Sequence, residues 1–388
     1  MAALVAMVAM LAMLVAPSVS GAAGVTPTPT NVTVTPGVGG VTVSWGAVAG
    51  GAVTYVVTST PAGLACTVVD QTSCTIPDTS TTRYTFAVVA TAPGLTRSLP
   101  STPTVRLTPR LVLVLAGQSN ANGYESYAVD PLTRVNYLAA PYLNGADSHD
   151  AITWLPWSEL QGAGAVPVPL DSPQQVLEGT TPATVFGPEL GLARQLWADT
   201  GRSVTVVKAA YSGTTLATNW NPARRGTPPD GLYRAMVAKV LAVVAADAAA
   251  GRFDVVGGFY WYQGESDATK PAWANAYQAH LTTLIDAVRA DLPMSPTAPV
   301  VLVKPDISGY IAYKVAVEGL PARWQAKFTD GNAAVRAADD WAAANLPGVR
   351  AVDSLGLARV GPYDLHLDNV AQLTLGQQLA KMSEPLLP

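Results

Sequence analysis

The chain has 388 residues, of which 49% are hydrophobic and only 13% are charged, and its formal net charge is −4 at pH 7. This composition supports a large core and excludes a wholly disordered chain, and the length predicts two or three domains. The weak negative charge, with no basic stripe, argues against a nucleic-acid-binding protein. Two cysteines are too few for a thiolate zinc cage, and the only imidazoles available as a base are those of His149, His280 and His366.

Residues 1–23 have the composition of an export signal. An apolar run of 15 residues, 2–16, precedes Pro17, Ser18 and a series of small residues. The run is shorter than the ~20 residues that a membrane-spanning helix needs, and a short apolar run before small residues is typical of a secretory signal peptide. No basic residue precedes the run, so a short uncleaved anchor is the alternative. We therefore expect a secreted or cell-surface protein without further contact with a membrane.

Residues 27–108 show the pattern of an all-β domain. Apolar and polar residues alternate in short runs such as VTVSW at 41–45, and turn-forming residues separate the runs. About seven strands fit into this length, as in a single β-sandwich. Trp45 and Tyr84 resemble the core tryptophan and the tyrosine corner of a fibronectin type III domain. The resemblance implies a sandwich that spaces or binds and carries no chemistry.

Both cysteines, Cys66 and Cys74, lie in this segment. In an exported chain they are expected to form a disulfide across a local loop. Two buried free thiols are the alternative.

Residues 111–388 change to alternating strands and helices. Largely apolar runs predict buried strands, and periodic segments between them predict helices. The expected strands are 111–117, 203–210, 255–264, 299–305 and 349–354, and the expected helices are 186–200, 231–250, 271–292, 324–344 and 369–384. This order predicts an α/β domain in which a five-stranded parallel sheet lies between two layers of helices. Ligands of such sheets bind at the carboxyl ends of the strands.

Polar residues follow four of these strands and are expected to converge at that edge. Ser119 comes directly after the first strand, and a serine becomes a nucleophile when a base removes its proton. His366 is the only histidine on a loop at this end of the sheet, and Asp364 could orient its ring. The backbone at Ser119 and Gly213 and the Gln263 amide could stabilise an oxyanion, where one donor is typically worth about 3 kcal/mol. The combination predicts transfer of an acyl group to water.

Other polar residues near these strand ends have alternative interpretations. Supporting roles or contacts with the substrate are predicted for Gln118, Asn120, Glu265, Asp267 and Lys208. Glu265 and Asp267 could also form a glycosidase pair, although their close spacing favours a supporting role. Asp353 and Asp368 are rivals of Asp364 as the acid. His280 is expected on a helix and His149 on a solvated loop, so no metal site is predicted. Trp154 and Trp157 are candidates for a wall on which sugars stack.

Four motifs in order resemble those of the SGNH hydrolase superfamily, namely GQSN at 117–120, KAAYSGTTL at 208–216, YQGESD at 262–267 and DLHLD at 364–368. The resemblance covers about 111–385 and is nearest to the sialate O-acetylesterase-like and acetylxylan-esterase-like carbohydrate esterases. It implies a flavodoxin-like α/β/α fold, Ser119 as nucleophile, His366 as base, and neither metal nor cofactor. Many relatives place the acid three residues before the histidine, where this chain has Tyr363, so Asp364 departs from that spacing.

These observations predict a secreted serine esterase that removes O-acetyl or other short acyl groups from an oligosaccharide or polysaccharide. Two alternatives remain. The chain could be a non-catalytic glycan-binding or structural surface or tail module built on a hydrolase fold. It could also be a lipase or thioesterase of the same superfamily.

Overall fold

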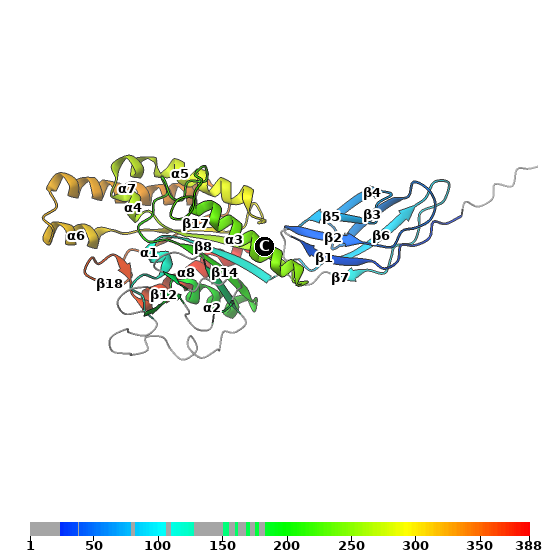
Figure 1. Ribbon diagram of the computed structural model, residues 1–388, viewed down its shortest axis with the longest axis horizontal. Coiled ribbons are helices and arrows are strands. Elements are labelled where there is room, and N and C mark those ends of the chain that lie inside the picture. Colours follow the sequence, from blue (N-terminus) through cyan, green and yellow to red (C-terminus); the bar gives the residue numbers. More distant parts are fainter. Residues whose placement is uncertain are drawn as a thin grey trace, which may run out of the picture.

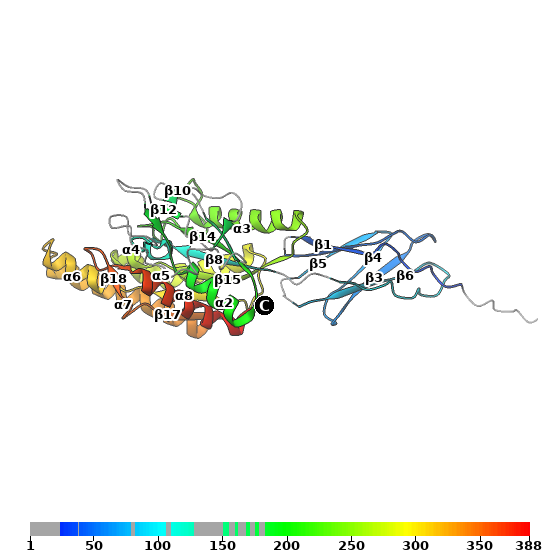
Figure 2. The same cartoon turned by 90° about the horizontal axis from the view of Figure 1, so that it is seen from below.

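The computed structural model describes residues 24–37, 39–78, 82–105, 110–127, 150–154, 160–161, 168–170, 175–177 and 183–388. The predicted export segment 1–23 lies outside them. Figures 1 and 2 show an all-β part and an α/β part arranged end to end. No helix of the described residues has the length and apolar character needed to cross a membrane.

The described residues of the N-terminal part form seven strands in two antiparallel sheets, which confirms the predicted all-β architecture. One sheet has the order β1-β2-β5 and the other β4-β3-β6-β7. Alternate residues of the strands point inward, and Val43, Trp45, Tyr55 and Phe86 are buried in a shared core. The strands are β1 (Thr33–Gly37), β2 (Gly40–Ser44), β3 (Thr54–Thr60), β4 (Ala65–Val69), β5 (Ser73–Pro77), β6 (Thr85–Thr91) and β7 (Thr104–Val105).

The predicted disulfide between Cys66 and Cys74 is present. Cys66 belongs to β4 and Cys74 to β5, so the bond joins strands of different sheets. It therefore ties the two layers of the sandwich together in addition to closing a short loop.

Replacing both cysteines by serine is expected to lower the free energy of unfolding of the sandwich by about 2–3 kcal/mol, because the unfolded chain regains the entropy of an open loop. Hydrogen exchange measured by mass spectrometry on the full chain would report the change. Peptides from the seven strands should lose protection, whereas peptides from the α/β sheet serve as the internal control. Equal protection of the strands in both proteins would contradict this prediction.

The α/β part is built around a sheet with the order β11-β9-β14-β8-β15-β16-β17. Its five predicted strands are confirmed, and their order is that of flavodoxin-like folds, 2-1-3-4-5 in sequence numbering. They are β8 (Arg110–Gly117), β14 (Val204–Ala210), β15 (Asp254–Tyr262), β16 (Val300–Lys304) and β17 (Val349–Asp353), all parallel. The structure adds a parallel strand, β9 (Ala151–Trp154), and an antiparallel one, β11 (Val168–Pro169). A separate small sheet contains β10 (Leu160–Gln161), β12 (Gln175–Leu177) and β13 (Ala183–Val185).

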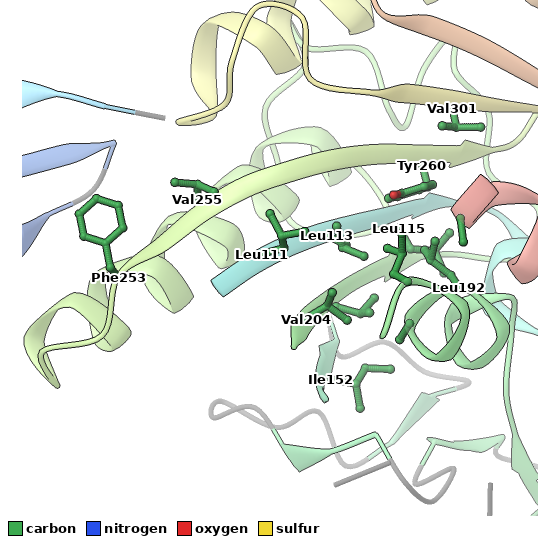
Figure 3. Packing of buried hydrophobic residues seen from close by; sticks show 14 of the residues in the cluster. Leu111, Leu113, Leu115, Ile152, Leu192, Val204, Phe253, Val255, Tyr260 and Val301 are labelled. Carbon is green, nitrogen blue, oxygen red and sulfur yellow. The ribbon is translucent and has the colours of Figure 1, made fainter. Parts of the chain in front are cut away.

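Helices cover both faces of this sheet, as the three-layer prediction requires. Leu111, Leu113 and Leu115 of β8 pack toward α2 (Glu189–Thr200) and α8 (Asn369–Ser383), as Figure 3 shows for Leu192 of α2. Val112 and Val114 belong instead to the core shared with α3 (Leu232–Ala249), α5 (Pro271–Asp291) and α7 (Ala322–Asn345). Figure 1 shows α5 and α7 on one side of the sheet and α2 on the other. Successive side chains of β8 thus point to opposite faces of the sheet and belong to two separate cores.

Short elements complete the molecule. They are α1 (Ser119–Asn122), α4 (Glu265–Ala268), α6 (Ser308–Ala316), η2 (Glu384–Leu386) and a hairpin of β18 (Arg359–Val360) with β19 (His366–Leu367). Helices α1 and α4 begin directly after β8 and β15, so both lie at the carboxyl edge of the parallel strands. The sandwich lies at the other end of the molecule, beyond the amino ends of these strands (Figures 1 and 2).

Candidate active site

A pocket of about 540 Å³ opens at the carboxyl edge of the sheet. Ser119, Gly213, Glu265 and His366 all line it, and they come from four segments that are far apart in the sequence. The expected convergence of the strand ends therefore brings the predicted nucleophile and the predicted base to one cavity.

The end of β8 places Ser119 in this pocket. Gly117 has φ +147°, and a Cβ atom at this position would overlap the carbonyl oxygen of Tyr262 in β15. Glycine therefore allows the two strands to remain paired while the chain turns into α1. The N–H of Gln118 donates to the same carbonyl oxygen at 3.0 Å, and Ser119 follows as the first residue of α1.

Asn120 joins the segment of the predicted nucleophile, Ser119, to the segment that carries His366. Its Oδ1 atom accepts a hydrogen bond from the N–H of Leu367 at 2.9 Å, and its Nδ2 atom donates to the carbonyl oxygen of Leu365 at 3.3 Å. The same Nδ2 atom donates to Oε1 of Glu265 at 2.9 Å. One amide next to Ser119 thus holds both backbone neighbours of His366.

The carboxylate beside the imidazole belongs to Glu125. Its Oε2 atom lies 2.7 Å from Nδ1 of His366, and the ring of Tyr124 lies 4.8 Å from the imidazole between centroids. Gly361, in the turn of the β18–β19 hairpin at φ +80°, leaves the space that the Glu125 carboxylate occupies. Glu125 and Tyr124 were not predicted as site residues from the sequence. The only sequence signal for Glu125 was that a carboxylate follows Ser119 closely, and the direction of its side chain depends on how the chain turns after α1.

The structure places none of the three predicted aspartates at the imidazole. Asp364 is exposed in the hairpin turn, where its carboxylate lies against Gly309 of α6. Asp368 caps α8 by accepting a hydrogen bond from the N–H of Ala371 at 2.7 Å.

Asp353 is paired elsewhere, with Arg336 at 2.7 Å and with Lys304 at 3.1 Å. Partial burial alone would raise the pKa of Asp353, but hydrogen bonds from these cations lower it to about 2. Glu125, and not the predicted Asp364, is therefore the carboxylate next to His366.

Gln263 does not line the pocket, in contrast to its predicted role as an oxyanion donor. Its side chain is fully buried, and its Nε2 atom lies 2.7 Å from Oδ2 of Asp267, 3.0 Å from the carbonyl oxygen of Thr214 and 3.2 Å from Oε1 of Gln118. An amide nitrogen carries two hydrogens, and both are occupied within the protein. Of the three predicted oxyanion donors, Ser119 and Gly213 line the cavity and Gln263 does not.

Asp267 fixes the loop that carries Gly213. Its carboxylate accepts hydrogen bonds from the N–H groups of Leu216 at 2.9 Å and of Ala217 at 3.1 Å. Burial raises the pKa of Asp267, although the hydrogen bonds from Gln263 and the loop oppose this effect. The residue lies outside the pocket lining, so Glu265 and Asp267 do not face one cavity as a glycosidase pair would.

Glu265 is buried at the wall of the pocket. Its Oε1 atom accepts from Asn120, whereas its Oε2 atom is buried without a hydrogen-bond partner among the described residues. Burial raises the pKa of Glu265, and the hydrogen bond from Asn120 opposes this effect.

Lys208 is fully buried within β14 and does not reach the pocket. Its Nζ atom donates to the carbonyl oxygen of Asn122 at 2.7 Å and to Oε1 of Glu189 at 2.9 Å. Burial lowers the pKa of Lys208, while Glu189 raises it. Lys208 therefore holds the end of α1 in place. Its position does not allow the alternative role of contacting the substrate.

The remaining candidates lie away from this cavity. His280 is part of α5 and outside the lining, and His149 and Trp157 are outside the described residues. Within the described ranges, no group of three His, Cys, Asp or Glu side chains is arranged to hold a metal ion.

The chain is similar to a known protein family and to several solved structures. The family described as carbohydrate esterase, sialic acid-specific acetylesterase, matches residues 109–384. A solved structure of an Arabidopsis thaliana protein is similar with 21% identity and a TM-score of 0.50, over 72% of this chain and 100% of that one. A carbohydrate acetylesterase from Xanthomonas citri has 17% identity and a TM-score of 0.48, over 90% of this chain and 71% of its own. No curated protein matches the chain.

Proposed function

Because the chain belongs to the carbohydrate esterase family of sialic acid-specific acetylesterases, we propose that it hydrolyses O-acetyl or other short acyl esters of carbohydrates. The observation that carries this proposal is the pocket itself, where Ser119 and a buried His366 paired with Glu125 at 2.7 Å line one cavity. The family supports the carbohydrate ester as substrate, and the pocket supports a serine mechanism.

In the proposed reaction, Ser119 Oγ attacks the carbonyl carbon of the ester while Nε2 of His366 accepts its proton. Glu125 accepts a hydrogen bond from Nδ1–H and thereby keeps Nε2 free to act as the base. The N–H groups of Ser119 and Gly213 stabilise the negative oxygen of the tetrahedral intermediate. His366 then returns the proton to the sugar oxygen, and the sugar leaves as the alcohol.

An acyl-enzyme on Ser119 remains after this first half. His366 removes a proton from a water molecule, which attacks the acyl carbon. Collapse of the second tetrahedral intermediate returns the proton to Ser119 Oγ and releases the carboxylic acid. One ester and one water thus give one alcohol and one acid.

Export and the type of N-terminal domain are part of the same proposal. The apolar segment 2–16 and a disulfide, which is stable in oxidising compartments, support secretion. Seven strands in two sheets around a buried Trp45 support a fibronectin type III-like sandwich over 27–108, followed by a catalytic domain over 111–388.

A fluorophosphonate probe is expected to label Ser119 covalently, because only an activated serine attacks the phosphorus. Peptide mass spectrometry would locate the label. Ser212 and Ser266 line the same pocket and serve as internal controls that should stay unmodified. Retention on an acetylated glycan without labelling would instead support the non-catalytic binding module.

A further inference from the structure

A second cavity, of about 610 Å³, adjoins the pocket of Ser119. Thr269 and Lys270 line both cavities, so the two are continuous along this edge. We call the second cavity the aromatic groove, and its lining consists of Thr269, Lys270, Pro271, Ala272, Trp273, Leu320, Trp324 and Phe328. It lies between the first turns of α5 and α7.

Aromatic rings form the walls of this groove. Trp273 projects from α5, whereas Trp324 and Phe328 lie one turn apart on α7, with ring centroids 6.3 Å from each other. Trp324 is 37% exposed, so part of its ring is accessible at the groove.

Ammonium groups accompany these rings. Nζ of Lys270 lies 3.8 Å from the ring centroid of Trp273, and Nζ of Lys327 lies 4.4 Å from that of Trp324. Each ammonium lies over one face of its indole ring, so the groove combines apolar aromatic surface with cationic hydrogen-bond donors.

A sugar ring matches this arrangement. The faces of a pyranose present C–H groups, which pack on the electron-rich face of an aromatic ring, and its edges carry hydroxyls that accept from ammonium donors. A long acyl chain matches it less well, because the two residues that line both cavities, Thr269 and Lys270, place polar groups where the cavities meet. An acyl chain would lose the hydration of these polar groups without replacing their hydrogen bonds.

We propose that the aromatic groove binds the sugar unit next to the acylated one, so that the substrate is an oligosaccharide or polysaccharide and the reaction takes place within a glycan chain. This inference rests on the proposed function of the Ser119 pocket. It assigns to Trp324 and Trp273 a binding role that the chemistry at Ser119 does not require.

The test compares each acetylated tetrasaccharide with its own acetylated monosaccharide, in xylo-, manno- and chito-series. Wild-type protein is expected to show a higher kcat/KM for the tetrasaccharide of at least one series. Trp324→Ala should reduce this ratio of tetrasaccharide to monosaccharide roughly five- to tenfold, which is the typical contribution of one aromatic contact. Trp324→Phe, which keeps a ring, should restore most of it.

Trp341→Ala is the matched control, because Trp341 lies on the same helix with 36% exposure and outside the groove. The ratio of kcat/KM for the tetrasaccharide to that for the monosaccharide should be the same in Trp341→Ala as in the wild type. Equal ratios in Trp324→Ala and wild type, or no preference for a tetrasaccharide in any series, would overturn the inference. A loss of kcat/KM in Trp324→Ala that is confined to p-nitrophenyl decanoate would also overturn the inference, because it would assign the groove to an acyl chain. Wild-type protein that hydrolyses no ester, p-nitrophenyl acetate included, would refute the proposed function itself.

Discussion

Ser119→Ala is expected to reduce kcat on p-nitrophenyl acetate and on acetylated xylan by about 10⁴-fold or more. The variant keeps the pocket and the paired His366, but it has no oxygen that can attack the ester carbon. The N–H groups at Ser119 and Gly213 remain, so a small residual rate above that of water is expected. Steady-state kinetics over a substrate series would measure the loss, with KM changing far less than kcat.

Ser295→Ala provides the matched control for this substitution. Ser295 precedes β16 at the amino end of the strands, and its hydroxyl contacts only the Thr297 hydroxyl and backbone among the described residues. It should retain wild-type kinetics. A folded Ser119→Ala protein that retains the wild-type rate would refute Ser119 as the nucleophile.

Glu125→Gln is expected to lower kcat by about 10²- to 10⁴-fold. The glutamine fills the same space, but its amide can donate to Nδ1 of His366 and so stabilise the tautomer that carries its proton on Nε2. That tautomer cannot accept the proton of Ser119. The lost carboxylate also no longer stabilises the imidazolium that forms during the reaction. The comparison needs kcat measured at a pH where wild-type activity is maximal.

Asp364→Asn distinguishes the observed partner of His366 from the predicted one. Asp364 has φ +46°, a conformation that asparagine also adopts readily, so this substitution preserves the hairpin turn. We expect wild-type kinetics. A large loss in Asp364→Asn with little loss in Glu125→Gln would return the acid role to Asp364 and show that the Glu125 contact is dispensable.

The architecture was largely predictable from the sequence because buried parallel strands are largely apolar runs. The five runs of the α/β part correspond to β8, β14, β15, β16 and β17. β9 escaped prediction because AITW is only four residues long, and β11, its neighbour at the edge of the sheet, contributes only two residues. Such short strands are defined by their pairing partners more than by their own sequence.

The sequence can predict where a residue lies when a strand end alone determines its position, but not when the direction of its side chain decides. Ser119 and His366 reach the same pocket because strand ends converge at one edge of the sheet. Gln263 also follows a strand, yet it points toward Asp267 and away from the cavity. Glu125 itself has φ +63° after a one-turn helix, a conformation that no local sequence pattern indicated.

The division of the site between two distant segments has a consequence for biosynthesis. Ser119, Asn120 and Glu125 belong to one short stretch near the beginning of the α/β part, whereas His366 arrives on a hairpin late in the sequence. A nascent polypeptide therefore contains the proposed nucleophile long before the ribosome has added the proposed base. The mechanism proposed above therefore predicts that the growing chain cleaves no ester until the β18–β19 hairpin has docked on the Asn120 amide.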